Sequence, residues 1–242
     1  MRSLTLYIIR HGYTQANVDG LYSGHGDVPL CDEGRRGIEK LKEEGAYPEV
    51  SFVFSSPLGR AVETAKIIYP EKTPAIVNEL IEYDFGEFEG RNAEELFKKA
   101  PLFERWLRGE PCVKPPFGES NEEFAARVCN CFVKLADGLI KEDIDKAIIV
   151  THGGVMGTIL SNCALPEAQV HEWNALPGCG YVLRLTPSFW ATHRRAEVVE
   201  TIPARPGDKN QYDGWDYYPD EDDYDITRDV YEDFDPLKEG QI

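Results

Sequence analysis

The stretch Leu4-Thr5-Leu6-Tyr7-Ile8-Ile9-Arg10-His11-Gly12 decides the fold, because an apolar run ends there in two cationic side chains and a glycine. The run is rich in β-branched and aromatic residues, which predicts a buried strand. Further segments of this kind alternate with helical patterns, and such alternation predicts a mostly parallel sheet with helices on both faces. We therefore expect a three-layer α/β/α fold with a six-stranded sheet, its strands at 4–9, 51–55, 75–78, 147–151, 181–185 and 197–201.

Helical periodicity fills the intervals between these strands. We expect helices at 33–44, 57–69, 93–99, 102–108, 121–141 and 155–163. Ser56-Pro57 predicts the start of the second helix, as an N-cap residue followed by proline at the first helical position. Ser120 and Glu123 predict the start of the long helix, because they have the spacing of a capping box.

The composition is typical of a globular enzyme in water. Hydrophobic residues make up 42% of the 242 residues, and no run approaches the roughly 18 apolar residues that span a bilayer. A formal net charge of −17 disfavours nucleic acid and anionic membranes as partners. The cysteines lack metal-ligand spacing, and the run at 4–9 is too short for a signal peptide. We expect reduced thiols, no metal, no cofactor and a cytoplasmic location.

A change of composition at 203–206 predicts one boundary in the chain. Residues 1–204 are expected to form a single domain. Residues 205–242 form an acidic tail, with 13 Asp and Glu against 4 Lys and Arg. Its seven aromatic residues are many for a mobile segment, so one hypothesis is that the tail lies across the body and narrows the entrance to a pocket.

Polar residues and glycines follow three of the predicted strands. These motifs are Arg10-His11-Gly12, Ser56-Pro57-Leu58-Gly59-Arg60 and Thr151-His152-Gly153-Gly154. Because the carboxyl ends of parallel strands meet at one edge of a sheet, we expect the histidines and arginines to gather there. Glycine lets backbone N–H groups approach a bound anion, and a first helical turn favours phosphate at Arg60. The three motifs together predict an anion site.

With Ala61-x-x-Thr64 after Arg60, these motifs resemble the histidine phosphatase superfamily, also called the phosphoglycerate mutase-like family, over residues 4–202. The resemblance implies that His11 is the nucleophile that forms a phosphohistidine, and that His152 stabilises the transferring group. It also implies that two arginines hold the phosphoryl oxygens of a small phosphate ester, which a monomer or a homodimer binds. The positions that match substrate-binding residues of the family are Arg10, Asn17, Ser23, Gly24, Arg60 and Gly153.

The segment 78–90 contains the family pattern Leu-x-Glu-x-x-Phe-Gly-x-aromatic-Glu-Gly. This match points to Glu82 as the acid that protonates the leaving oxygen, and then as the base that activates water. The other carboxylates of the segment, Asp84, Glu87 and Glu89, stay open as alternatives.

Mutases and phosphatases of this family share the catalytic set. The glycolytic mutases have a longer basic insertion with Arg-Arg-Ser-Tyr, which is absent from the corresponding stretch 105–111. The runs 84–90 and 117–120 look like the phosphatase branch, and 14–25 is similar to α-ribazole phosphatases. We therefore expect a phosphomonoesterase, with a phosphoglycerate-type mutase or a catalytically silent phospho-ligand binding module as alternatives. His25, His171 and His193 are expected to be structural or surface residues.

Overall fold

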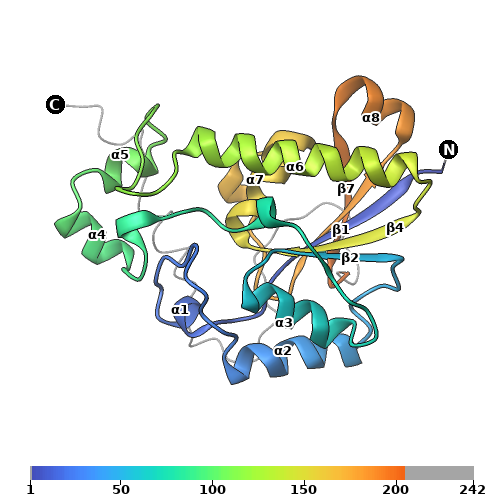
Figure 1. Cartoon of the computed structure of the whole chain (residues 1–242), viewed down its shortest axis with the longest axis horizontal. Coiled ribbons are helices and arrows are strands. Elements are labelled where there is room, and N and C mark those ends of the chain that lie inside the picture. The colour runs from blue at the N-terminus through green and yellow to red at the C-terminus, as the bar shows by residue number, and fades with distance from the viewer. Residues whose placement is uncertain (1, 205–242) are drawn as a thin grey trace.

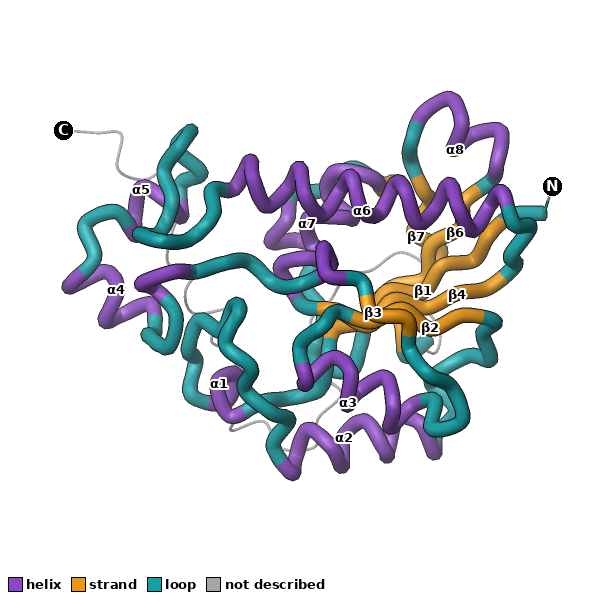
Figure 2. Tube along the Cα trace, viewed as in Figure 1, coloured by secondary structure: helices purple, strands orange, loops and turns teal. Residues whose placement is uncertain are grey.

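One sheet lies between two layers of helices, as the tube in Figure 2 shows. The computed structural model describes residues 2–204, and the predicted acidic tail at 205–242 lies outside the described residues. The predicted boundary near 204 therefore stays a prediction. Within the described part, the layered α/β/α architecture predicted from the alternation of elements is confirmed.

The sheet has the strand order β3-β2-β4-β1-β6-β7-β5. Its pairs are parallel except for β1–β6 and β6–β7, so β6 alone runs against the others. The predicted count of six strands is wrong by one, because the two-residue β5 is too short to leave a pattern in the sequence. The strands are β1 (Leu4–Arg10), β2 (Phe52–Ser55), β3 (Ala75–Ile76), β4 (Lys146–Thr151), β5 (Ala164–Leu165), β6 (Gly180–Leu185) and β7 (Ala196–Ile202).

Helices α6 and α7 cover one face of the sheet, and α2 and α3 cover the other (Figure 1). Two short helices, α1 with four residues and α8 with seven, were not predicted. The helices are α1 (Gln15–Val18), α2 (Asp32–Glu43), α3 (Gly59–Ile68), α4 (Ala93–Lys99), α5 (Phe103–Leu107), α6 (Asn121–Lys141), α7 (Gly153–Cys163) and α8 (Pro187–His193).

The long helix α6 begins and ends where the sequence predicts. Its capping box is present: the Ser120 N–H donates to Glu123 Oε2 at 2.8 Å, and the Glu123 N–H donates to Ser120 Oγ at 3.2 Å. The apolar stripe of α6 enters the core, where the ring of Phe132 lies 5.8 Å from that of Trp190. Within residues 2–204, no helix is long and apolar enough to cross a bilayer.

The predicted start of α3 is wrong by two residues. The helix begins at Gly59, and Ser56 does not cap it. Instead, the Gly59 N–H donates to Oδ1 of Asp27 at 2.8 Å, so a carboxylate from a distant loop satisfies the helix N-terminus. The hydroxyl of Ser56 accepts the N–H of Leu58 at 3.3 Å, just before the helix, and also contacts Nε2 of His152 at 2.7 Å.

An aromatic cluster fills the loops beyond the carboxyl ends of the parallel strands, where α1, α4 and α5 lie in Figure 1. Tyr83 and Phe85 stack with their centroids 5.1 Å apart, and the ring of Trp106 lies 5.5 Å from Tyr83. Trp106 Nε1 also donates to Tyr83 Oη at 2.8 Å, so this buried hydroxyl is paired. The cluster anchors the segment that carries Glu82.

Replacing Phe132 with alanine removes a fully buried ring between α6 and α8. We expect Phe132→Ala to lower the free energy of unfolding by about 3–5 kcal/mol, from lost transfer energy and a residual cavity. Urea denaturation measures this difference. Phe117→Ala is the matched control, because Phe117 is 89% exposed, and its expected effect is within about 0.5 kcal/mol. Equal losses in the two variants would contradict this account of the core.

Candidate active site

The buried polar residues gather where β1, β2 and β4 end. His11 follows β1, Ser56 follows β2 and His152 follows β4, and all three are buried. Arg60 in α3 and Glu82 in an irregular segment are buried as well. The expectation that parallel pairing brings the three motifs together at one edge of the sheet is therefore confirmed.

His11 has one ring nitrogen fixed by its own turn. Nδ1 lies 2.7 Å from the carbonyl oxygen of Gly12. Because a carbonyl only accepts hydrogen bonds, Nδ1 carries the proton and Nε2 keeps a lone pair. Burial, Arg60 and Arg10 all lower the pKa of His11 well below its ordinary value, so the ring is neutral near pH 7. A neutral imidazole with a free Nε2 lone pair is the form that attacks phosphorus.

The glycine of this turn does not serve as expected. The N–H of Gly12 donates to Thr64 Oγ1 at 3.0 Å instead of facing the anion site. Thr64 Oγ1 in turn donates to the Arg60 carbonyl at 2.8 Å. Helix α3 thus holds the His11 turn in place. The requirement for glycine is steric here, because a Cβ at position 12 would lie 3.0 Å from Cγ1 of Ile38.

His152 lies beside His11, with ring centroids 5.1 Å apart and planes inclined by 65°. Arg60 Nε donates to His152 Nδ1 at 3.3 Å. His152 therefore carries its proton on Nε2, which lies 2.7 Å from Ser56 Oγ. Burial comes first among the causes that lower the pKa of His152, followed by His11 and the arginines, so this ring is also neutral near pH 7.

The guanidinium of Arg60 is buried and joins α3 to the loop 23–26. It donates to the carbonyls of Gly26 at 2.7 Å, Gly24 at 2.8 Å and Ser23 at 3.3 Å. With the bond to His152, these contacts use four of the five N–H donors of a guanidinium. Counting partners within residues 2–204, one donor is left for an anion, so a forked contact from Arg60 would displace a loop carbonyl. Burial lowers the pKa of Arg60, and the Glu82 carboxylate opposes that shift.

Arg10 is the last residue of β1, and its side chain lies next to the start of α7. Its Nη1 donates to the carbonyl of Ala175 at 3.0 Å. A Cβ added at Gly153 would lie 3.5 Å from Nε of Arg10, so the first residue of α7 and this guanidinium are neighbours. The predicted arginine pair and the helix N-terminus therefore lie around the same two histidines.

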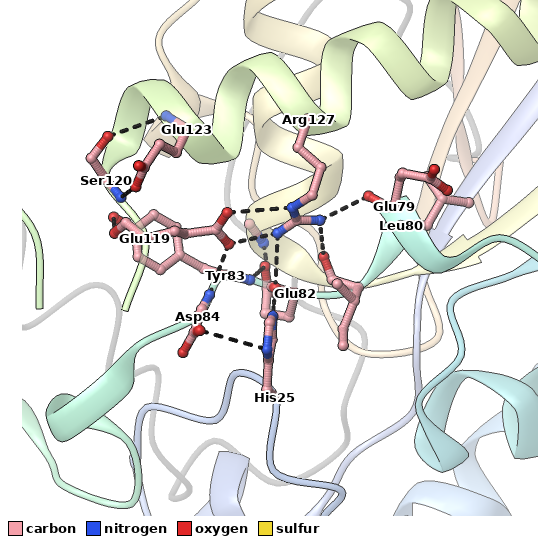
Figure 3. Close-up of polar contacts among 12 residues, drawn as sticks. His25, Glu79, Leu80, Glu82, Tyr83, Asp84, Glu119, Ser120, Glu123 and Arg127 are labelled. Carbon is pink, nitrogen blue, oxygen red and sulfur yellow. Dashed lines mark hydrogen bonds and ion pairs between the residues drawn. The ribbon is translucent and has the colours of Figure 1, made fainter. Parts of the chain in front are cut away.

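The carboxylate of Glu82 is held at the N-terminus of α7. Its Oε2 accepts the N–H of Gly154 at 3.0 Å, and its Oε1 accepts the N–H of Tyr83 at 2.9 Å. Figure 3 shows the surroundings of this residue. The rival carboxylates are placed otherwise: Asp84 accepts from Gly86, Glu89 accepts from the 24–26 loop, and Glu87 is exposed. Burial of its side chain at the N-terminus of α7 favours Glu82 among the four.

The three remaining predicted contact residues come before α2: Asn17 lies in α1, and Ser23 and Gly24 lie in the loop between α1 and α2. Asn17 Oδ1 accepts from the N–H and the hydroxyl of Thr14, so the Nδ2 end of this amide is the one that could meet a phosphate. Ser23 Oγ is buried and has no hydrogen-bond partner within residues 2–204. Gly24 is a packing residue, because a Cβ there would lie 2.1 Å from the Tyr83 carbonyl oxygen.

Sequence reasoning missed three residues of this site. Ser56 was assigned to a helix cap, although its hydroxyl contacts His152. His25 was expected to be structural or on the surface, yet its Nε2 lies 3.1 Å from the Glu82 carbonyl oxygen. Arg127 of α6 was not singled out, and it reaches the same carbonyl. Spacing in the sequence cannot reveal these contacts, because 45 to 96 residues separate the partners.

In the described part of the chain, no group of three His, Cys, Asp or Glu side chains is placed to hold a metal ion. The polar groups at the ends of β1 and β4 are instead two neutral imidazoles, two guanidiniums and one carboxylate. Such a set binds a phosphoryl group by hydrogen bonds and charge and offers nitrogen as the nucleophile.

The chain belongs to the histidine phosphatase superfamily, branch 1, whose family model matches residues 6–198. The predicted family and the predicted enzyme class, a histidine phosphatase, are therefore confirmed. The match begins in β1 and ends in β7, so it covers all the elements that build the site.

Curated relatives and solved structures agree with this membership. The chain is 31% identical over 193 residues to the adenosylcobalamin/alpha-ribazole phosphatase of Escherichia coli K12, covering 77% of this chain and 92% of that protein. The alpha-ribazole phosphatase of Shigella flexneri superposes with a TM-score of 0.71 at 26% identity, over 83% and 96% of the two chains. A phosphoglycerate mutase of Thermus thermophilus superposes with a TM-score of 0.59 at 30% identity, over 80% and 96%.

Both buried histidines should stay neutral when the pH falls through the ordinary histidine range. Their lowered pKa values mean that the unfolded chain takes up these protons near pH about 6.5 while the folded chain does not, so the free energy of unfolding falls as the pH drops below that value. NMR of ring-labelled histidine, with the His11 signals assigned from a His11→Ala sample, measures this. Titration of either ring with a midpoint between pH 6 and 7 would contradict the geometry.

Proposed function

We propose that this chain hydrolyses a small phosphate monoester by way of a phosphohistidine on Nε2 of His11. The observation that carries the proposal is the bond from His11 Nδ1–H to the Gly12 carbonyl, because it leaves the Nε2 lone pair on a neutral ring. The guanidiniums of Arg10 and Arg60 flank that ring and supply positive charge where the phosphoryl group would bind.

In the first step, Nε2 of His11 attacks phosphorus and the bond from phosphorus to the ester oxygen breaks. The leaving oxygen takes a proton from the Glu82 carboxyl group. Both oxygens of Glu82 accept one backbone N–H each, and each keeps a further lone pair that can carry that proton. Arg10 stabilises the charge on the transferring phosphoryl group, and His152 does so once its Nε2–H turns from Ser56 Oγ to a phosphoryl oxygen.

In the second step, water attacks the phosphohistidine, and the bond from nitrogen to phosphorus breaks. Glu82, now a carboxylate, takes the proton of the attacking water, so the cycle returns it to its acid form. His11 leaves as the neutral ring with which it began. Ser23 lies beside Arg60 and Asn17 lies in α1, and both are proposed to contact the phosphate or the alcohol part of the ester. Gly24 and Gly153 have no Cβ, and we propose that the backbone at these two positions can therefore come close to the bound ester.

The proposed ester is α-ribazole 5′-phosphate or a close analogue. The relatives named adenosylcobalamin/alpha-ribazole phosphatase support this choice, as do the runs 14–25 and 84–90 of the sequence. Mutase names among the relatives keep phosphoglycerate mutation as the second candidate. The short stretch at 105–111, which lacks the basic insertion, favours hydrolysis over mutation.

The proposal also covers the catalytic domain, the cellular location and the oligomeric state. We assign catalysis to residues 1–204 and place the enzyme in the cytoplasm as a monomer or homodimer. The free thiol state of all six cysteines is compatible with a reducing compartment. A net charge of −17 disfavours nucleic acid as a partner. It does not exclude a phosphate ester, because Arg10 and Arg60 would act within a few ångströms while dissolved ions screen the more distant acids.

Incubation with α-ribazole 5′-phosphate, p-nitrophenyl phosphate and 3-phosphoglycerate tests the proposed reaction. We expect release of inorganic phosphate from the first two without metal, and no isomerisation of the third. The His11→Ala protein should lose turnover while its melting temperature stays close to that of the parent. Isomerisation of 3-phosphoglycerate would favour the mutase. A fully active His11→Ala protein would overturn the phosphohistidine, and no turnover of any phosphate ester would favour a phospho-ligand binding module.

Replacing Glu82 with glutamine removes the proposed proton carrier and keeps its shape. For an alkyl phosphate, whose leaving oxygen needs a proton, we expect kcat to fall by about 10²–10⁴. For p-nitrophenyl phosphate the loss should be much smaller, because p-nitrophenolate leaves without protonation. Glu87→Gln is the control, since Glu87 lies in the same segment and is exposed. Equal losses for the two substrates would point to a different acid.

A further inference from the structure

Arg127 of α6 contacts the segment that carries Glu82 through several carbonyls at once. Its Nη1 donates to the carbonyls of Glu79 at 2.8 Å and Ile81 at 2.9 Å, and its Nη2 donates to the Glu82 carbonyl at 3.2 Å. Figure 3 shows the guanidinium between α6 and this segment. Segment 81–85 has no regular secondary structure, so side-chain donors replace the ladder or helix bonds that would otherwise fix its backbone.

Glu119 holds the guanidinium of Arg127 in this position. Its carboxylate accepts Nη2 at 2.6 Å and Nε at 3.3 Å, which is a two-pronged ion pair. The side chains of Arg127 and Glu119 are only 22% and 14% exposed. Such a pair is geometrically specific, and its removal would leave a partly buried charge without its partner.

Glu119 also contacts the Glu82 segment directly. Its Oε1 accepts the N–H of Asp84 at 2.9 Å, its N–H donates to the Asp84 carbonyl at 3.1 Å, and its carbonyl accepts Tyr83 Oη at 2.7 Å. Arg127 and Glu119 together thus bind the backbone on both sides of Glu82, from residue 79 to residue 84.

The opposite side of the segment is held by the site itself. His25 Nε2 donates to the Glu82 carbonyl at 3.1 Å, and Thr151 Oγ1 donates to the Leu80 carbonyl at 2.9 Å. The Glu82 carbonyl therefore accepts one hydrogen bond from the catalytic loops and one from α6. A shift of the backbone toward either side would lengthen one of these two bonds.

We propose that Arg127, oriented by Glu119, is a positioning residue that sets the place of the Glu82 carboxylate at the N-terminus of α7. The proposal rests on the proposed function, in which Glu82 carries the proton. A displacement of about 1 Å at a catalytic group can cost about 10²-fold in rate, so three hydrogen bonds to its backbone segment are enough to matter. Arg127 touches no reacting atom and acts only through Glu82.

A purely structural ion pair would behave differently from a positioning residue. Losing a structural pair lowers stability and the active fraction, and this slows all substrates by the same factor. Losing the placement of an acid slows substrates with poor leaving groups more than those with good ones, because only the former need the proton. The ratio of the two rates therefore separates the alternatives.

The test compares the parent, Arg127→Met, Glu82→Gln and the double variant on an alkyl phosphate and on p-nitrophenyl phosphate. We expect Arg127→Met to lower kcat on the alkyl phosphate roughly 10- to 100-fold, with a much smaller effect on p-nitrophenyl phosphate. In the Glu82→Gln background, Arg127→Met should change kcat on the alkyl phosphate by less than about twofold, because the group that Arg127 positions is no longer an acid.

Two further variants keep the test decisive. Arg127→Lys keeps the charge but cannot reach three carbonyls and a carboxylate together, so we expect a selective loss smaller than that of Arg127→Met. It also replaces Arg127→Met if that protein lacks a cooperative melting transition. Arg184→Met is the control. Arg184 on β6 forms an ion pair with Glu197 on β7 at 3.0 Å, away from the site. The rates of the Arg184→Met protein should match those of the parent.

The outcomes separate this proposal from the proposed function. Equal slowing of both substrates by the Arg127 variants, or additive losses in the double variant, would overturn the positioning role alone. A Glu82→Gln protein that retains its rate on the alkyl phosphate would overturn the proton carrier, and the role of Arg127 with it. The positioning role of Arg127 is supported if its variants slow the alkyl phosphate selectively and this selective loss vanishes in the Glu82→Gln background.

Discussion

Strand β1 pairs with β4 in parallel, with Arg10 beside Thr151, and the rest of the site depends on this register. Because each strand is followed at once by a histidine, the pairing puts His11 and His152 side by side, with rings 5.1 Å apart. A slip of one residue would turn the side chains of β1 to the opposite face of the sheet and would separate the two rings. Such a slip is costly because four residues of β1 and five of β4 are buried.

Burial then gives these groups their chemical character. Two imidazoles close to two guanidiniums would repel if all were charged, and burial further disfavours the charged rings, so the histidines stay neutral and the arginines carry the charge. Each neutral ring has its tautomer fixed by a different partner, a carbonyl for His11 and Arg60 for His152. The site is thus locally cationic in a chain whose formal net charge is −17.

The motifs at the strand ends could be predicted from the sequence, since a run of apolar residues followed by His-Gly is a local signal. Local signals also predicted α6 correctly, through Ser120 and Glu123. They misplaced the start of α3, because the Ser56 hydroxyl accepts from Leu58 and contacts His152, while Asp27 accepts the first N–H of the helix. The group that caps a helix depends on which donors and acceptors lie near it in space. His152, which also contacts the Ser56 hydroxyl, lies 96 residues away in the sequence.

The sequence by itself determined the alternation of strands and helices, the family and the candidate nucleophile, because these depend on composition and spacing within short segments. The tertiary structure alone decided which nitrogen of His11 is free, that Arg60 donates to the carbonyls of the 23–26 loop, and that Arg127 reaches the backbone of Glu82. Those properties depend on hydrogen bonds between residues far apart in the chain, and hydrogen-bond geometry exists only once the elements have packed.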